Sequence, residues 1–273
     1  MGCGIIVYLG DGKPVRDIVR ALAALEDIMY PGEKTPVGGH GAGIAWLDRD
    51  GRMRRLRLPA SALPSPARRL LSLVPDDVCI AAIGHVRRAS ERFLDTITYE
   101  WGAQPFLCRC LDDILVYCAH NGFVKNYAEL CARLEASHRF ETRHAEAIRD
   151  PPHIIDSEVV PHLIASLLAE GLDPMGIAPK LLGHLEGGNT VAALISRGDS
   201  RYMLLAHKGM TRGLVVSLSE EGELYAASRP EALLSLGIKA SHIQLAPLCE
   251  LRRIEDKGGR FHVELALCLP VRL

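Results

Sequence analysis

The stretch VCIAAIGHVRRAS, residues 78–90, carries the clearest strand signal in the chain. Its first nine residues are almost all apolar, which predicts a strand buried in the core. The apolar run ends at two arginines, Arg87 and Arg88. A guanidinium group directly after a buried strand is placed to bind an anion, because its planar fork matches a carboxylate in two hydrogen bonds. The alternative is a surface arginine, which we expect for Arg88; for Arg87, at a partly exposed strand end, the choice depends on the motifs described below.

The segments on either side of this strand indicate a mixed fold. Residues 3–9 (CGIIVYL) and 114–120 (ILVYCAH) are also apolar and rich in β-branched residues, as buried strands are. Helices are predicted over residues 14–30, 67–74, 127–134, 156–169 and 174–185, short strands over 190–196, 202–207, 214–218 and 224–227, and a final hairpin around Gly258-Gly259. This order does not alternate as in a doubly wound sheet. It predicts one α+β domain over residues 1–273, with two antiparallel sheets, helices outside them and four layers in all.

The composition excludes several classes of protein. The 32 Lys and Arg residues balance 33 Asp and Glu residues, so no basic excess points to nucleic-acid binding. Apolar residues make up 48% and charged residues 24%, as in soluble globular proteins. No apolar run approaches the ~18 residues of a membrane span. The first residues lack a basic region and reach Asp11 early, unlike a signal peptide, so we expect a cytoplasmic protein with its eight cysteines mostly unpaired.

Cys3 has two interpretations. A cysteine at the start of a buried strand is often a small hydrophobic residue of the core. The alternative is a nucleophile, which needs a base beside the thiol. If the chain began at Cys3, its own α-amino group, with a pKa of about 8, would lie next to the sulfur and serve as that base.

Two further motifs carry polar groups at the ends of predicted elements. In His120-Asn121-Gly122, a side-chain amide stands beside a glycine N–H, a pair of donors that can stabilise an oxyanion. The alternative is an ordinary Asn-Gly turn. Asp156 opens a predicted helix and is an N-cap candidate, although its carboxylate could also hold a substrate ammonium. Glu158 then falls in the first helical turn, where negative charge is favourable.

A metal site and a phosphate site were both considered and are not expected. Cys108 and Cys110, and likewise Cys118 and His120, are i and i+2 pairs on two predicted strands, so each pair faces one way. Their spacing is not that of a common zinc module, which leads us to expect no metal and no cofactor. The glycine-rich residues 38–43 precede a strand instead of a helix, unlike a phosphate-binding loop.

Five motifs follow one another along the chain: CGI (3–5), GHVRRAS (84–90), AQPF (103–106), HNGFVKNYAEL (120–130) and DSEVVPHLI (156–164). In this order and spacing they resemble the class II glutamine amidotransferases, the N-terminal-nucleophile family whose domain occurs in glucosamine-6-phosphate synthase, amidophosphoribosyltransferase and asparagine synthetase. The resemblance runs from Cys3 to about Gly209. It implies a four-layer αββα sandwich.

The resemblance also implies a set of site residues: Cys3, Asn121 and Gly122 for catalysis, and Arg87, Asp156, His120 and Ser90 for binding glutamine. In the implied reaction, the Cys3 thiolate attacks the side-chain amide, Asn121 and Gly122 hold the oxyanion, ammonia leaves, and water hydrolyses the thioester. Arg87 and Asp156 would hold the two charged ends of the amino acid. The 273 residues contain no synthase half, so we expect a stand-alone domain that hydrolyses glutamine or passes the ammonia to a separate partner synthase.

One departure from the family pattern affects the predicted activity. The family's mature chain begins with Cys, whereas Gly2 stands before Cys3 here. Removal of Met1 alone would leave Cys3 without a free amine. Three hypotheses follow: a glutaminase that requires further processing, an inactive member that binds glutamine or a partner protein, or a hydrolase of the same fold acting on another amide.

Overall fold

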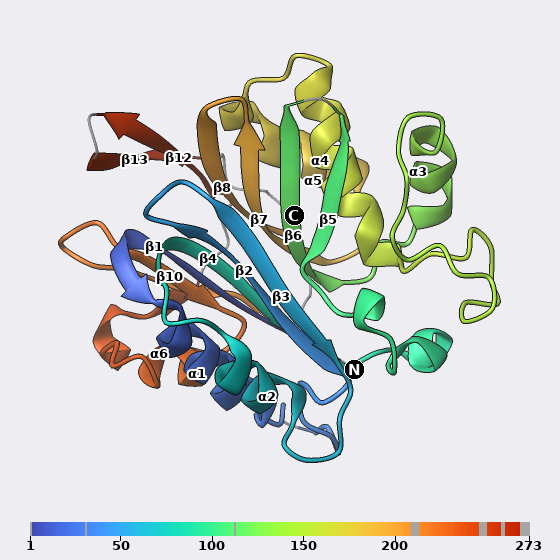
Figure 1. Ribbon diagram of the computed structural model, residues 1–273, viewed down its shortest axis with the longest axis horizontal. Helices are drawn as coiled ribbons and strands as arrows, with labels where there is room; N and C mark the ends of the chain where they lie inside the picture. The colour runs from blue at the N-terminus through green and yellow to red at the C-terminus, as the bar shows by residue number, and fades with distance from the viewer. Residues whose placement is uncertain are drawn as a thin grey trace. The chain divides into compact units, whose positions relative to one another are not determined.

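The computed structural model describes residues 2–30, 32–111, 113–208, 213–245, 250–257 and 260–267. The chain divides into two compact units, which are described separately. Unit 1 comprises Met1–Pro105 and Arg212–Ala246, and unit 2 comprises Phe106–Thr211 and Pro247–Leu273. Figure 1 shows both units, coloured along the chain from blue at residue 1 to red at residue 273.

Unit 1 is a seven-stranded antiparallel sheet in the order β11-β9-β10-β1-β4-β2-β3. The strands are β1 (Gly4–Pro14), β2 (Gly41–Asp48), β3 (Met53–Pro59), β4 (Val78–Val86), β9 (Val215–Leu218), β10 (Leu224–Ala227) and β11 (Gln244–Leu245). The helices α1 (Val15–Glu26), α2 (Pro66–Leu73) and α6 (Pro230–Leu234) pack against this sheet (Figure 1). Their apolar sides and the sheet form one core, which includes Ile18, Leu22 and Trp46.

The pairing of β1 with β4 fixes the local arrangement of the predicted site in unit 1. Gly4 pairs with Val86 in an antiparallel register. In such a register the residue before Gly4 is level with the residue after Val86. Two segments some eighty residues apart, each apolar enough to be buried, thereby bring Cys3 beside Arg87 and Arg88.

Unit 2 is a six-stranded antiparallel sheet in the order β13-β12-β8-β7-β6-β5. The strands are β5 (Phe106–Leu111), β6 (Ile114–Gly122), β7 (Asn189–Arg197), β8 (Ser200–Lys208), β12 (Glu250–Lys257) and β13 (Arg260–Leu267). The helix α4 (Val159–Ala169) packs on β5 and β6, α5 (Ile177–His184) packs on β8, and α3 (Tyr127–Leu134) packs on α4. Helix α4 is apolar on most sides, as expected for a helix enclosed by other elements.

The sequence-based assignment of elements is largely confirmed. The main difference is the helix predicted from residue 156: Asp156–Glu158 form a 3-10 turn, η3, and the α-helix begins at Val159. The predicted N-cap role of Asp156 is therefore wrong, since its side chain bonds elsewhere. Strands β12 and β13 pair as the predicted hairpin, whereas its turn, Gly258-Gly259, lies outside the described residues. The single domain over residues 1–273 stays a prediction.

Among the described residues, no helix is both long enough and apolar enough to cross a bilayer.

Candidate active site

Cys3 lies at the start of β1, where its thiol contacts the main chain of Arg88. The Arg88 N–H donates to Cys3 Sγ at 3.3 Å, and the thiol lies 3.6 Å from the Arg88 carbonyl oxygen. Cys3 is half-buried, in contrast to Cys79 of β4, which is fully buried within the core of the same sheet. The Cys79 thiol also contacts a main-chain carbonyl, that of Lys13 at 3.3 Å, so Cys3 differs from it in its partial exposure and in the N–H that its sulfur accepts.

Arg87 is buried, and the expectation of a partly exposed strand end is wrong. Its side chain is only 4% exposed and is held by Thr96, with Nη2 donating to Oγ1 at 2.6 Å and Nη1 to the carbonyl oxygen at 3.4 Å. Thr96 ends the 3-10 helix η1 (Glu91–Thr96), which Ser90 precedes. A methyl group at Gly102 would lie 2.8 Å from Arg87 Nη1, so the glycine leaves room for the guanidinium.

Arg88 is also not the surface residue that the sequence suggested. It is half-buried, donating from Nε to the Pro36 carbonyl at 3.0 Å and lying 3.0 Å from His40 Nε2 through Nη1. His40 in turn accepts from the Ala89 N–H at 3.1 Å. Burial and the neighbouring Arg88 charge lower the pKa of His40 to about 4, so its ring is neutral at pH 7. His40 lies in the glycine-rich residues 38–43, whose pattern carried no signal for a role of this histidine at the site.

In unit 2, Asn121 and Gly122 end strand β6. They pair with Thr190 and Asn189 of β7, so the pair extends the sheet and is not a two-residue turn. Gly122 has φ +151°, and an added Cβ would lie 2.3 Å from the Gly188 carbonyl oxygen, a clash that only glycine avoids. The main chain of Gly122 is exposed next to the buried Asn121.

His120 is buried behind this strand end, with both ring nitrogens bonded inside unit 2. Nδ1 lies 2.8 Å from Ser157 Oγ and Nε2 lies 2.9 Å from Asn189 Oδ1. Burial lowers the pKa of His120 to about 4, which keeps the ring neutral. These contacts link β6, η3 and β7, so they favour a role in positioning Asn121 and Gly122 over direct contact with a substrate.

Asp156 is buried close to the same strand end. Its Oδ2 accepts a hydrogen bond from the Val124 N–H at 3.0 Å, two residues beyond Gly122. The carboxylate thus fixes the segment that follows the candidate oxyanion residues. Unit 1 therefore brings together Cys3 and Arg87, with Ser90 directly before η1, and unit 2 brings together His120, Asn121, Gly122 and Asp156.

The four-residue metal set considered from the sequence is not assembled. Cys118 is fully buried, with its thiol directed at the Ala119 carbonyl, and His120 bonds Ser157 and Asn189. Cys108 and Cys110 instead lie with His138 and His162, two residues that the sequence analysis did not consider.

Comparisons with known proteins agree with the motifs. No protein-family model matches the chain. The glutamine–fructose-6-phosphate aminotransferase of Brucella abortus is 30% identical over 243 residues, which is 89% of this chain and 34% of that protein. The enzyme of the same name from Streptomyces coelicolor is 28% identical over 92% of this chain and 35% of its own length. The chain thus spans about a third of the length of the curated relatives it matches.

Solved structures show the same fold. The glutamine phosphoribosylpyrophosphate amidotransferase of B. subtilis superimposes with a TM-score of 0.61 at 22% identity, over 96% of this chain and 49% of that one. A glutamine aminotransferase class-II domain protein from Silicibacter pomeroyi gives a TM-score of 0.51 at 16% identity, over 98% of this chain and all of that one. The predicted α+β fold class, the αββα sandwich of the N-terminal-nucleophile hydrolases, is confirmed. Over most of its length, the chain is therefore similar to the class II glutamine amidotransferases in sequence and fold.

Proposed function

We propose that this protein hydrolyses the side-chain amide of glutamine with Cys3 as the nucleophile and passes the ammonia to an acceptor synthase. The similarity to glutamine-dependent enzymes supports the substrate. The observation that carries the proposal is the placement of Cys3: its half-buried thiol contacts the Arg88 main chain directly before the start of β1, level with Arg87. A nucleophile held in one orientation beside an anion-binding arginine suits an amino-acid substrate.

In the proposed mechanism the Cys3 α-amine takes the thiol proton, and the thiolate attacks the amide carbon. The Asn121 side chain and the Gly122 N–H donate to the resulting oxyanion. Collapse of the tetrahedral intermediate expels ammonia, which receives the proton from the α-amine, and leaves a thioester. Water then hydrolyses the thioester to glutamate and free thiol.

The buried Arg87 and Asp156 account for specificity in this proposal. Arg87 binds the α-carboxylate and Asp156 the α-ammonium, while Ser90 and His120 support the segments that carry them. Both charged residues are held by hydrogen bonds from inside the protein, Arg87 by Thr96 and Asp156 by Val124. Such preorganisation lowers the entropy lost when the substrate binds.

The mechanism requires that Cys3 be the first residue of the active protein. A thiol with a pKa near 8.5 is mostly protonated at neutral pH and needs a base within hydrogen-bond reach. A peptide bond to Gly2 turns the Cys3 nitrogen into an amide, which cannot accept the proton. Activity therefore depends on removal of Met1 and Gly2.

The test compares the full-length protein with a variant in which Gly2 is deleted, so that loss of Met1 exposes Cys3. Intact mass establishes the first residue of each preparation, and glutamate and ammonia release measure turnover. We expect the variant to be at least about 100-fold more active, as general-base catalysis contributes factors of that order. Equal turnover by a homogeneous preparation that retains Gly2 would overturn the mechanism.

A second candidate function is glutamine binding without catalysis. It is favoured by one observation: Gly2 is itself buried in the full-length chain, next to the thiol. Calorimetric titration with glutamine separates the two. Binding by both forms without product release by either supports the non-catalytic role, whereas product release after exposure of Cys3 supports the enzyme.

A further inference from the structure

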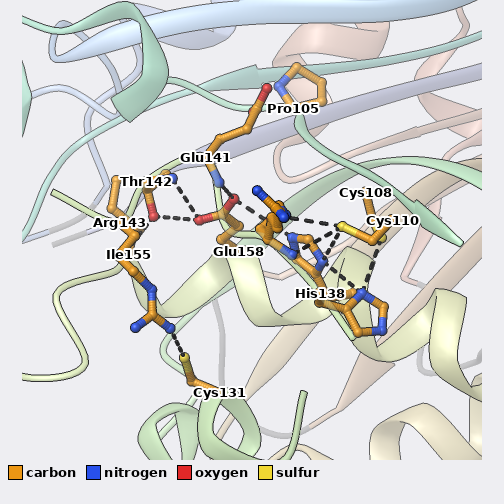
Figure 2. A network of polar contacts seen from close by, with 12 residues as sticks. Pro105, Cys108, Cys110, Cys131, His138, Glu141, Thr142, Arg143, Ile155 and Glu158 are labelled. Atoms are coloured by element: carbon orange, nitrogen blue, oxygen red, sulfur yellow. Dashed lines mark hydrogen bonds and ion pairs between the residues drawn. The ribbon is translucent and has the colours of Figure 1, made fainter. Parts of the chain in front are cut away.

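Two cysteines and two histidines of unit 2 converge on one point. Cys108 and Cys110 lie on β5, His138 follows α3, and His162 lies on α4. The register of β5 shifts after Cys108, and each of the two thiols contacts an imidazole: Cys108 contacts His138, and Cys110 contacts His162 of α4. The two sulfur atoms and one nitrogen of each ring all lie within 4.8 Å of one another. Figure 2 shows the Cys108 and Cys110 sulfur atoms beside the His138 ring.

The separations of these atoms match the ligands of a tetrahedral metal ion. Cys108 Sγ lies 3.5 Å from His138 Nδ1, and Cys110 Sγ lies 3.8 Å from His162 Nδ1. The two Nδ1 atoms are 3.0 Å apart. Zinc bonds of about 2.3 Å to sulfur and 2.0–2.1 Å to nitrogen, arranged tetrahedrally, place S and N about 3.5 Å apart and N and N about 3.3 Å apart. These three separations lie within a few tenths of an ångström of the zinc values, and the remaining pairs of ligand atoms lie within 4.8 Å of each other.

The outer nitrogen of each histidine faces a partner of the kind that orients metal-bound imidazoles. His138 Nε2 lies 2.9 Å from Ser166 Oγ. His162 Nε2 is buried without a hydrogen bond and lies 3.7 Å from Glu158 Oε1. A carboxylate behind a ligand histidine fixes its tautomer, so that Nδ1 presents its lone pair to the metal.

Glu158 is itself firmly held. It is fully buried and accepts hydrogen bonds from the N–H groups of Glu141 and Thr142 and from the Thr142 hydroxyl (Figure 2). The sulfur of Cys110 also accepts from the Arg139 N–H at 3.2 Å. The loop after His138 therefore supplies donors both to a thiol of the cluster and to the carboxylate behind it.

From this arrangement we infer that Cys108, Cys110, His138 and His162 form a structural zinc site. Four soft and borderline ligands in tetrahedral positions select Zn²⁺ over Mg²⁺ or Ca²⁺, which prefer oxygen. All four ligands come from this chain, and three of them are buried, so no position stays open for water or substrate. The ion joins β5, the loop after α3 and α4, and it takes no part in the proposed glutamine chemistry.

The first test is the metal content of the untagged full-length protein, purified without chelators. Elemental analysis is expected to find close to one zinc ion per chain, released when the thiols are titrated with a mercurial reagent. Cobalt added to the metal-free protein is expected to give the intense visible bands of tetrahedral Co²⁺ together with thiolate charge-transfer bands. Metal-free, reduced protein that gives neither band overturns the inference.

The second test compares variants of the proposed ligands with a variant of a buried cysteine of unit 2 that lies outside the cluster. Cys108→Ser and His162→Gln are expected to lose the zinc and to unfold at a lower temperature than the unmodified protein. Addition of a chelator should not lower the unfolding temperature of these variants any further. Cys118→Ser, a change to a fully buried thiol outside the cluster, is expected to keep the metal. Equal zinc in Cys108→Ser and the unmodified protein contradicts the site. The cobalt spectrum of the unmodified protein still decides the question if a variant fails to fold.

Discussion

Cys3 in unit 1 and the pair Cys108 and Cys110 in unit 2 are thiols in contrasting surroundings. The sulfur of Cys3 contacts the main-chain N–H and carbonyl of Arg88 at a strand end. Each thiol of the pair instead lies beside an imidazole, and the hydrogen bond with His162 lowers the pKa of Cys110 to about 7. Cys79 shows a third environment, in which burial raises the thiol pKa to about 12.

The contrast teaches that local pKa alone does not identify the nucleophile. The thiols with adjacent imidazoles converge with two histidines in a closed cluster, a geometry that suits a metal better than a substrate. Cys3 stands beside Arg87, which can bind a substrate anion, and its base in the proposed mechanism is an amine that peptide cleavage would create. Substitution of Cys3 should therefore abolish turnover and leave the metal bound, whereas substitution of Cys108 or Cys110 should remove the metal and leave turnover unchanged.

The largest effect is expected from Cys3→Ala in the form that begins at residue 3. Loss of the nucleophile should lower glutaminase turnover on the order of 10⁴-fold or more, with zinc content unchanged. In the same form, Cys108→Ala should lose zinc and keep turnover at temperatures where circular dichroism shows the protein folded. Cys79→Ala, another buried cysteine of the β1–β4 pair, serves as the control for unit 1. Turnover that survives in Cys3→Ala but disappears in Cys108→Ala would reverse the assignment.

Asn121→Ala tests whether unit 2 also contributes to catalysis. Removal of one oxyanion donor typically costs about 10²–10³ in kcat, and we expect a loss of this size with little change in KM. Zinc content should stay at the level of the unmodified protein, because Asn121 lies outside the cluster. A rise in KM alone, measured by steady-state glutamate release, would show that Asn121 binds substrate and does not stabilise the oxyanion.

Much of the fold could be predicted from the sequence, because apolar strands such as residues 78–86 and amphipathic helices carry strong periodic signals. The exposure of Arg87 and Arg88 could not be predicted. It depends on η1 and on the loop around His40, which fold back over the strand end. The Asp156 N-cap prediction failed for a similar reason, since the Val124 N–H competes for the carboxylate.

The cluster of Cys108, Cys110, His138 and His162 in unit 2 could not be predicted from the sequence either. The sequence offered Cys108 and Cys110 as an i, i+2 pair but suggested Cys118 and His120 as their partners, on the neighbouring strand. Strand pairing does not place the two pairs opposite each other, because Cys118 is opposite Phe106 and Cys108 is opposite Val116. Instead, His162 of helix α4 and His138 of the loop after α3 lie beside Cys108 and Cys110. A spacing of 24 residues between two histidines matches no common zinc module, so only the fold reveals the set.

Glu158→Gln tests whether the carboxylate behind the proposed ligand His162 contributes to metal affinity. The amide keeps the size of the side chain but removes the charge behind His162. Loss of such an outer partner lowers metal affinity by about 10- to 100-fold, and we expect a change in this range in competition with a zinc chelator. Glu146→Gln, at an exposed carboxylate of the same unit, is the matched control. Equal affinities in the two variants would show that Glu158 holds only the loop at Glu141 and Thr142.

The smallest expected effect concerns His120, whose neutral ring packs between Ser157 and Asn189 and not among thiols. Its native pKa of about 4 lies below the pKa of about 6.5 in an unfolded chain, so the unfolded state binds the proton first as the pH falls. The contribution of this group to the free energy of unfolding is therefore complete above pH ~6.5 and decreases towards pH ~4, by about 2 kcal/mol between pH 7 and pH 5.

The His120→Gln variant should have a lower free energy of unfolding at pH 7. Between pH 7 and pH 5, urea denaturation should show a smaller decrease in that free energy for the variant than for the unmodified protein. His242→Gln, at an exposed histidine, should keep the unmodified slope. An unchanged slope in His120→Gln would mean that the ring has the same pKa in the folded and unfolded states, and would contradict a buried neutral ring at this position.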